Sequence, residues 1–430
     1  MTEPYELTAT EIVAAIEANE LTCEALAISC VERVESQEGN LRAWAHLDRD
    51  AVFTAARAAD KSSSRGLLKG VPFGAKDIID SVDMPTTHGS AIYAGNRPAW
   101  DAPCIAACRN EGAFLFGKTV TAEFAHVQPG PTRNPFNSDH TPGGSSSGSA
   151  AAVGAGMVPV AFGTQTTGST IRPAAFCGAV GYKPSYGDFS LTGVRDNSPS
   201  LDTLGLIARS VADLALFRTA IMLLPFVKLA EVDLSCLRVS ICRTPWWEQA
   251  EVYTQDLVID VASRLSSAGA TVTDFEMPEG TADLVQAMRD VSGFEFARVM
   301  LHERLHHLDQ LSQKLLAGRV NDGIHCSYTD YRGALATLDS YRGRFAAAME
   351  GVDLLLTPSA TGEAPKGIDS TGNPVFNLPW TATYAPVVTL PAGRGPKGLP
   401  LGVQLVGCRN DDHRFLSAAQ AVERLLNDVD

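Results

Sequence analysis

Two stretches rich in glycine, serine and threonine lie in the middle of this sequence. The first is Gly143-Gly-Ser-Ser-Ser-Gly148, which runs into an alanine-rich segment at residues 150–155, and the second is Gly163-Thr-Gln-Thr-Thr-Gly-Ser-Thr-Ile-Arg172. Glycine and serine favour loops and alanine favours helices, so the first stretch predicts a loop that opens a helix. Free backbone N–H groups meet the positive end of the helix dipole at such a place, which is a general site for anions. Because no Gly-Lys-Ser/Thr ending follows, a nucleotide-binding loop is not favoured.

Short apolar segments alternate with amphipathic ones on both sides of these stretches. We expect strands at residues 112–118, 237–242, 271–275, 353–356, 387–390 and 401–406. We expect helices at residues 256–267 and 416–426, and a helical pattern over residues 285–350. A strand, a helix and a strand in succession imply an α/β architecture. No repeat or long linker interrupts the chain, so one large α/β domain is favoured over several small ones.

The N-terminal part has the pattern of helices. Thr8 and Glu11 form a capping box, and Thr22 can cap a second helix. A polar loop is expected at residues 61–65, and the short apolar segment Val71-Pro-Phe then leads to Lys76.

The composition is that of a globular enzyme, with 45% hydrophobic and 20% charged residues among 430. A net charge of −14 without basic runs disfavours nucleic acid and anionic membranes as partners. The acidic N-terminus does not resemble a secretory signal, and no apolar stretch approaches the roughly 20 residues that span a bilayer. Nine cysteines without Cys-x-x-Cys pairs indicate reduced thiols. We therefore expect a cytoplasmic protein.

The serines need a base before they can act chemically, because a serine hydroxyl is a poor nucleophile until a neighbour accepts its proton. Only His140 lies close to either stretch in the sequence, and no Gly-x-Ser-x-Gly motif is present. A neutral lysine can replace histidine if burial lowers its pKa from about 10.4 towards about 7. Lys76, in Gly74-Ala-Lys-Asp77, is the candidate. Backbone N–H groups near Gly148, Gly163 and Gly168 could then hold a reacting carbonyl oxygen.

Taken together, these motifs resemble the signature region of the amidase signature family. The family has its lysine in Pro-x-x-x-Lys-Asp, as in Pro72-Phe-Gly-Ala-Lys-Asp77, and a Gly-Gly-Ser-Ser-Ser-Gly loop before Gly-Thr-x-Thr-x-Gly-Ser. The resemblance implies that Ser169 is the nucleophile and that Ser145, after a cis peptide bond, connects it to Lys76. It also implies an oxyanion hole formed by the backbone amides of Thr166, Thr167, Gly168 and Ser169.

Further similarities cover about residues 5 to 425. They are found in Met84-Pro-Thr-Thr-His-Gly-Ser90, Gly117-Lys-Thr119, Glu123-Phe-Ala125, Asn134-Pro135, Phe176-Cys-Gly-Ala-Val-Gly-Tyr-Lys-Pro184, Asp202-Thr-Leu-Gly205 and Gly398-Leu-Pro-Leu-Gly-Val-Gln-Leu-Val-Gly407. The implied fold is α/β: a single large domain, residues 1–430, with a mixed central β-sheet flanked by helices on both faces. Its parts are N-terminal helices (about 5–60), a catalytic core (about 66–215), a variable substrate-pocket region (about 225–350) and a C-terminal return of sheet and helix (about 351–428).

Three positions depart from the common family pattern. Gln165 stands where the family commonly has Asp, and Thr167 stands where it has Gly. A β-branched Thr167 narrows the conformations open to the oxyanion loop, which bears on substrate range rather than on the relay. The third departure, Ser169-Thr-Ile-Arg172 in place of Ser-Ile-Arg, resembles the malonamidase-like amidases.

The roles of three neighbouring residues stay open at this stage. Arg172 could grip a substrate carboxylate in a bidentate manner, or it could pair with an Asp or Glu of the chain and brace the loop. Thr164 could hydrogen-bond the connecting serine or be satisfied by the backbone. Asp202 is expected to tie loops together near the site.

The predicted function is hydrolysis of a small-molecule carboxylic amide to an acid and ammonia or an amine, without cofactor or metal. One alternative is the glutamine-hydrolysing subunit of an amidotransferase, and a homodimer is a possible assembly. The other alternative is a zinc hydrolase, because His302-Glu-Arg-Leu-His306 matches the His-Glu-x-x-His pattern. No Gly-x-x-His follows to supply a third ligand, so the zinc alternative is disfavoured.

Overall fold

A single mixed sheet organises the chain. The computed structural model describes residues 3–62 and 66–428, and within them it contains an 11-stranded sheet. In chain order the strands are β1 (Trp44–His46), β2 (Pro72–Lys76), β3 (Phe114–Thr119), β4 (Val160–Gln165), β5 (Val180–Lys183), β6 (Thr203–Ala208), β7 (Arg238–Cys242), β8 (Thr271–Phe275), β9 (Leu354–Pro358), β10 (Val387–Arg394) and β11 (Pro400–Val406). Their order across the sheet is β1-β3-β2-β4-β6-β5-β10-β11-β9-β7-β8.

The sheet combines two parallel groups with antiparallel strands between and beside them. β2 is parallel to β3 and β4, and β7 is parallel to β8 and β9. The remaining pairs are antiparallel. The six predicted strands correspond to β3, β7, β8, β9, β10 and β11, with ends displaced by a few residues at most. The β7-α8-β8 succession confirms the α/β expectation.

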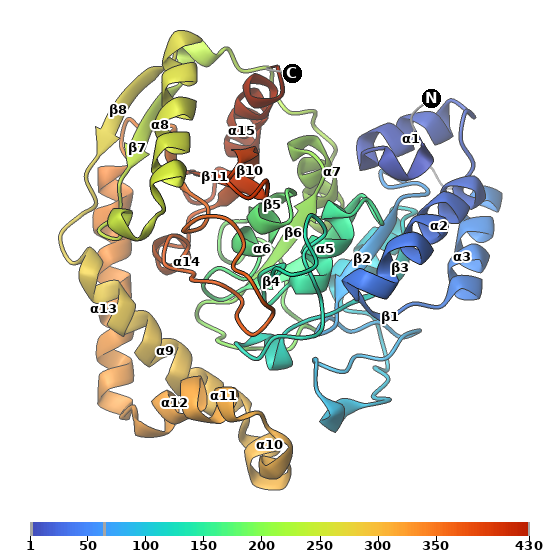
Figure 1. The fold of residues 1–430 in the computed structure, drawn as a ribbon, viewed down its shortest axis with the longest axis horizontal. Coiled ribbons are helices and arrows are strands. Elements are labelled where there is room, and N and C mark those ends of the chain that lie inside the picture. The colour runs from blue at the N-terminus through green and yellow to red at the C-terminus, as the bar shows by residue number, and fades with distance from the viewer. Residues whose placement is uncertain (1–2, 63–65, 429–430) are drawn as a thin grey trace.

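Helices surround this sheet (Figure 1). They are α1 (Ala9–Glu17), α2 (Cys23–Leu41), α3 (Arg49–Lys61), α4 (Pro103–Asn110), α5 (Ser147–Gly154), α6 (Ile171–Phe176), α7 (Val211–Ile221), α8 (Val252–Ser267), α9 (Leu284–Val299), α10 (Leu301–His306), α11 (Gln313–Leu315), α12 (Asn321–His325), α13 (Tyr328–Ala348), α14 (Leu378–Ala382) and α15 (Asp412–Asn427). Thr8 and Thr22 cap α1 and α2 as predicted, and Glu11 completes the capping box.

Both faces of the central sheet are covered. Every residue of β2, β4 and β6 is buried, although successive side chains of a strand point to opposite faces. The helix α5 packs against β2, β4 and β6, α6 against β5, β10 and β11, and α7 against β6. The predicted mixed sheet flanked by helices is therefore confirmed. The predicted polar loop at 61–65 lies mostly outside the described residues.

The region 285–350 is helical, as expected. Helix α9 packs against α12 and against α13, and Figure 1 shows these helices as an arm beside the sheet with α10 at its tip. A π-helical turn, Leu316–Val320, connects α11 to α12. Across the described ranges, no helix combines the length and the apolar character that a membrane span requires.

Candidate active site

Lys76 lies at the carboxyl end of β2, next to the end of β4. Because these two strands are parallel, Lys76 and Thr164 leave the sheet at the same edge. The Nζ atom of Lys76 donates to Ser145 Oγ at 2.7 Å and to Thr164 Oγ1 at 2.8 Å. These bonds answer the open question about Thr164, because its hydroxyl accepts a hydrogen bond from Lys76 rather than bonding Ser145.

The environment of Lys76 disfavours its charge. The side chain is fully buried, and burial lowers the pKa of Lys76 to about 7, while the charge of Asp202 acts in the opposite direction. A lysine with this pKa is neutral in a large fraction of molecules near neutral pH, so it can accept a proton.

Ser145 lies in the loop that opens α5. Its peptide bond to Gly144 is cis, as the family resemblance implied. The loop is fixed on two sides, because Ala122 N donates to the carbonyl of Ser145 at 3.1 Å and Ser146 N donates to the carbonyl of Ser169 at 3.2 Å. The second bond places the Ser145 and Ser169 segments against each other.

Ser169 lies in the turn between β4 and α6. The side-chain oxygen of Gln165 accepts from the amides of Thr170 and Ile171 at 3.0 and 3.1 Å, which holds this turn. An acceptor is all that this position requires, so Gln165 can do what the Asp of other family members would do. Ser169 is half-buried, and its hydroxyl makes no hydrogen bond within the described part of the chain.

The backbone amides of Thr166, Thr167, Gly168 and Ser169 make no hydrogen bond to any described residue of the chain, in helices, strands or loops. Four adjacent free donors beside a serine are the donors that an oxyanion hole needs. Gly168 is required here for space, because a Cβ atom would lie 2.4 Å from Asn377 Oδ1.

Gly148, in contrast, does not belong to this group of donors. Its amide donates to the carbonyl of Val120, and a Cβ atom would collide with the backbone of Ala43 and Val120. Gly148 therefore serves the packing of α5 rather than the binding of a carbonyl oxygen.

Asp202 connects several loops around the site, as expected. It accepts from Thr166 Oγ1 at 2.5 Å and from the amides of Asn197 and Ser198 at 2.7 Å each. Burial raises the pKa of Asp202 to about 6, and these hydrogen bonds partly oppose the effect. The carboxylate therefore holds the loop that carries Thr166 while its charge lies near Lys76.

Arg172 braces the connecting-serine loop, but through carbonyl groups rather than a carboxylate. Its Nε donates to Thr371 O at 2.6 Å, and its Nη2 donates to Gly144 O at 2.7 Å. Of the two alternatives left open, the one in which Arg172 pairs with an Asp or Glu is therefore wrong within the described residues, although its bracing of the loop is found. The remaining nitrogen, Nη1, is buried without a partner among the described residues, and Arg172 lines the cavity at Ser169. A donor is left for a bound ligand.

Two adjacent cavities meet at the turn that carries Ser169. The inner one, of about 100 Å³, is lined by Thr166–Ser169 and Arg172, and the outer one, of about 280 Å³, extends towards α9. His126, Val127, Thr167 and Arg319 line both. The sequence did not single out His126 or Arg319, which come from the end of a 3₁₀ turn and from the distant π-helical turn.

Arg319 brings a second buried guanidinium to the cavity. Its Nη1 donates to Asn197 Oδ1 at 2.5 Å, and the group lies 5.9 Å from the ring centre of Phe296. Burial lowers the pKa of Arg319 to about 10, opposed by Asp202 and Asp322, so the group stays charged at neutral pH. The walls of the inner cavity thus carry two cations, Arg172 and Arg319.

The residues of the His-Glu-x-x-His pattern, His302, Glu303 and His306, are not arranged as zinc ligands and a general base would be. His302 and His306 lie on one face of α10 with ring centres 5.0 Å apart, and both are exposed. Glu303 is buried, pairs with Arg195 at 2.7 Å and accepts from Tyr93 at 2.5 Å. The described residues contain no group of three or more His, Cys, Asp or Glu side chains suited to a metal ion.

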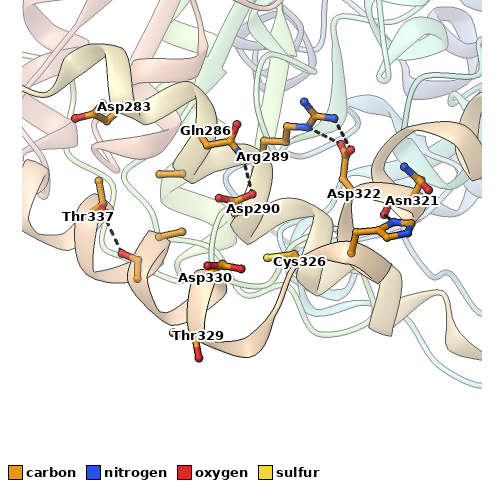
Figure 2. Close-up of a pocket in the computed structure, with 14 residues that line it drawn as sticks. Asp283, Gln286, Arg289, Asp290, Asn321, Asp322, Cys326, Thr329, Asp330 and Thr337 are labelled. Carbon is orange, nitrogen blue, oxygen red and sulfur yellow. Dashed lines mark hydrogen bonds and ion pairs between the residues drawn. The ribbon is translucent and has the colours of Figure 1, made fainter.

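A wider groove of about 910 Å³ lies between α9, α12 and α13 (Figure 2). Its walls include Asp283, Asp290 and Asp330, and none of the relay residues lines it. The ion pair of Arg289 and Asp322 borders both this groove and the outer cavity. The Ser169 cavity, although smaller, is the one lined by the candidate nucleophile and by the free amides of residues 166–169.

The fold and the site define an α/β hydrolytic enzyme with serine and lysine side chains at its centre. The chain belongs to the amidase family, whose model, described as Amidase, matches residues 25–416. The members of this family are amide-hydrolysing enzymes, and this chain is one of them.

Known proteins are similar over almost the whole chain. A glutamyl-tRNA(Gln) amidotransferase subunit from Chloroflexus aggregans is 32% identical, over 99% of this chain and 97% of that protein. A solved amidase structure is 28% identical with a TM-score of 0.89, covering 97% of this chain and 99% of that one. The peptide amidase from Stenotrophomonas maltophilia is 27% identical with a TM-score of 0.84, covering 99% and 98%.

Proposed function

We propose that the chain is a cytoplasmic amidase that hydrolyses small carboxylic amides through an acyl-enzyme on Ser169. The observation that carries the proposal is the buried Lys76, with its pKa lowered to about 7, bonded to Ser145 beside the Ser169 turn. The cytoplasmic assignment is supported by the cysteines, all nine of which are free thiols.

In each half of the reaction, one proton moves from the nucleophile to Lys76 and then returns to the leaving group. Neutral Lys76 takes the proton of the Ser145 hydroxyl, Ser145 takes that of Ser169, and the Ser169 oxygen attacks the amide carbon. The carbonyl oxygen becomes negative and is stabilised by the free amides of residues 166–169. The proton then passes back through Ser145 to the leaving nitrogen, and water repeats the sequence on the acyl-enzyme to release the acid.

The cavity charges indicate the kind of acyl group. Arg172 presents an unpartnered Nη1, and Arg319, although distant in the sequence, lines the same cavity. A carboxylate can satisfy both guanidinium groups. We therefore propose short acids with a terminal amide as substrates, in line with the malonamidase-like resemblance, and a pocket shaped by the variable region that supplies Arg319.

A second candidate function follows from those relatives that are components of an amidotransferase. Glutamine is itself an amide with a carboxylate, so the same site could hydrolyse it for a partner protein. Co-purification from the source cells tests this candidate, and light scattering distinguishes a monomer, a homodimer and a larger complex.

The main proposal is tested by ammonia release from a panel of amides, comparing the parent with Ser169→Ala. We expect the parent to cleave at least one short amide acid without any partner, and the variant to be at least about a thousandfold slower. Turnover by Ser169→Ala within about tenfold of the parent would remove Ser169 as nucleophile.

A further inference from the structure

His126 lies on the wall between the inner and the outer cavity. It lines both of them, and it is 9% exposed. Its Nε2 atom is buried without a hydrogen-bond partner among the described residues. A buried polar atom without a partner is uncommon in folded proteins, and at a cavity wall it points to a ligand that supplies the missing bond.

The backbone before His126 is held in an unusual conformation. Phe124 and Ala125 both have positive φ angles, 47° and 56°, which non-glycine residues rarely adopt. Hydrogen bonds enforce this shape: Phe124 N donates to His88 O at 2.8 Å, and Asn197 Nδ2 donates to Ala125 O at 3.1 Å. Strained backbone that is fixed from several sides is concentrated at functional sites, and here it sets the direction of the imidazole.

The surroundings of His126 keep the imidazole neutral. Its ring lies 5.1 Å from that of Phe296, and burial together with the charge of Arg319 lowers the pKa of His126 well below the usual range. A neutral imidazole has one N–H donor and one acceptor nitrogen. Asn197 links the two residues, since its side chain bonds both Arg319 and the carbonyl of Ala125. His126 and Arg319 are therefore placed as a pair.

We propose that His126 is a specificity-determining residue whose Nε2–H donates to an oxygen of the substrate's acid group, beside the guanidinium groups of Arg172 and Arg319. The inference rests on the proposed function, because it takes the substrate's acyl part to carry an acid group. His126 is then the third donor to that group, after Arg172 and Arg319. Three donors around one carboxylate would discriminate strongly against a neutral substituent, which would leave the buried Nε2 and both cations unpaired.

The test compares succinamate with 4-methylpentanamide, in which an isopropyl group replaces the carboxylate. His126→Met keeps the size of the side chain and removes the donor, whereas His126→Gln keeps a donor. For His126→Met we expect kcat/KM for succinamate to fall about tenfold to a hundredfold and that for 4-methylpentanamide to change less than about threefold. His126→Gln should recover a large part of the loss. His302→Met, at an exposed histidine, is the matched control and should leave both values unchanged.

Binding gives a readout that does not depend on turnover or on variants at His126. In Ser169→Ala, the ¹⁵N resonance of the His126 Nε2 atom should shift on titration with succinamate but not with 4-methylpentanamide. An unshifted resonance in the presence of bound succinamate, or equal losses for both substrates in His126→Met, would overturn the inference. If the parent cleaves no amide at all, the proposed function fails, and the resonance still decides whether His126 contacts the acid group.

Discussion

Replacing Lys76 by methionine should abolish catalysis and at the same time relieve a pH-dependent destabilisation. The pKa of Lys76 is lowered from 10.5 to about 7 in the folded protein. Between these values the unfolded chain binds more protons than the folded one, so stability rises with pH across this window. The cost of burying Lys76 is fully present below about pH 7 and fades as the pH approaches about 10.5.

The magnitude follows from the two pKa values. They differ by about 3.5, and a difference of one corresponds to about 1.4 kcal/mol, so the full cost is about 5 kcal/mol. Between about pH 7 and about pH 9.5 this cost falls by about 3 kcal/mol. Methionine is unbranched, similar in length and uncharged. The advantage of Lys76→Met over the parent in free energy of unfolding should therefore be about 3 kcal/mol larger at the lower pH.

Urea unfolding at several pH values measures this difference, because groups that titrate in both proteins cancel. Ser169→Ala is the control: it removes the proposed nucleophile but keeps the lysine, so its stability should follow the parent at every pH. If the difference between Lys76→Met and the parent stays constant within about 0.5 kcal/mol, Lys76 is not a buried neutral base, and the proton relay loses its acceptor.

The remaining predictions concern activity. Lys76→Ala should abolish turnover, whereas Ser145→Ala should leave a small residual activity. The double variant should lose little more activity than Lys76→Ala alone, as measured by initial rates. The rate should rise with pH through about 7 as Lys76 loses its proton; a flat profile from about pH 5 to about pH 9, with chemistry limiting, contradicts this. Chelators, and His302→Ala with His306→Ala, should leave the rate unchanged; loss on chelation and recovery with zinc would replace the serine mechanism. Arg172→Lys should lower kcat/KM for all amides, because it loses the bonds to Thr371 and Gly144, but the loss should be at least about tenfold larger for acid-bearing amides than for neutral ones.

The sequence was sufficient for the architecture because its strands and helices follow strong local patterns. The segment at residues 271–275 becomes β8 with unchanged ends, and Thr8 caps α1 as its spacing with Glu11 predicts. The order of strands across the sheet could not be read in the same way. It depends on pairings such as β5 with β10, between residues about two hundred positions apart, which no local pattern encodes.

The contact of Lys76 with Ser145 was predictable from the sequence and the lining of the cavity was not, for a physical reason. Lys76, Ser145 and Ser169 sit in short motifs whose residue types are dictated by chemistry. Arg319 is a single arginine in a helical region, and only the folding of the π-helical turn onto the cavity gives it a role. The local feature that distinguishes His126 is the pair of positive φ angles before it, and these angles cannot be read from the sequence.

This division places reaction and selection on different parts of the molecule. Lys76 and Thr164 stand on the buried parallel strands β2 and β4, and Ser145 and Ser169 lie in the loop and the turn beside them. Arg319 comes from a turn between short helices of the arm; its side chain bonds Asn197, and its neighbour Val320 packs with Phe124 and Phe296. Asn197 also bonds Asp202 and the carbonyl of Ala125, so one amide side chain and its backbone connect the base's environment to the selecting residues. Changes in the arm should therefore alter substrate choice first, and they should reach Lys76 when they disturb Asn197 or the charge of Arg319 beside Asp202.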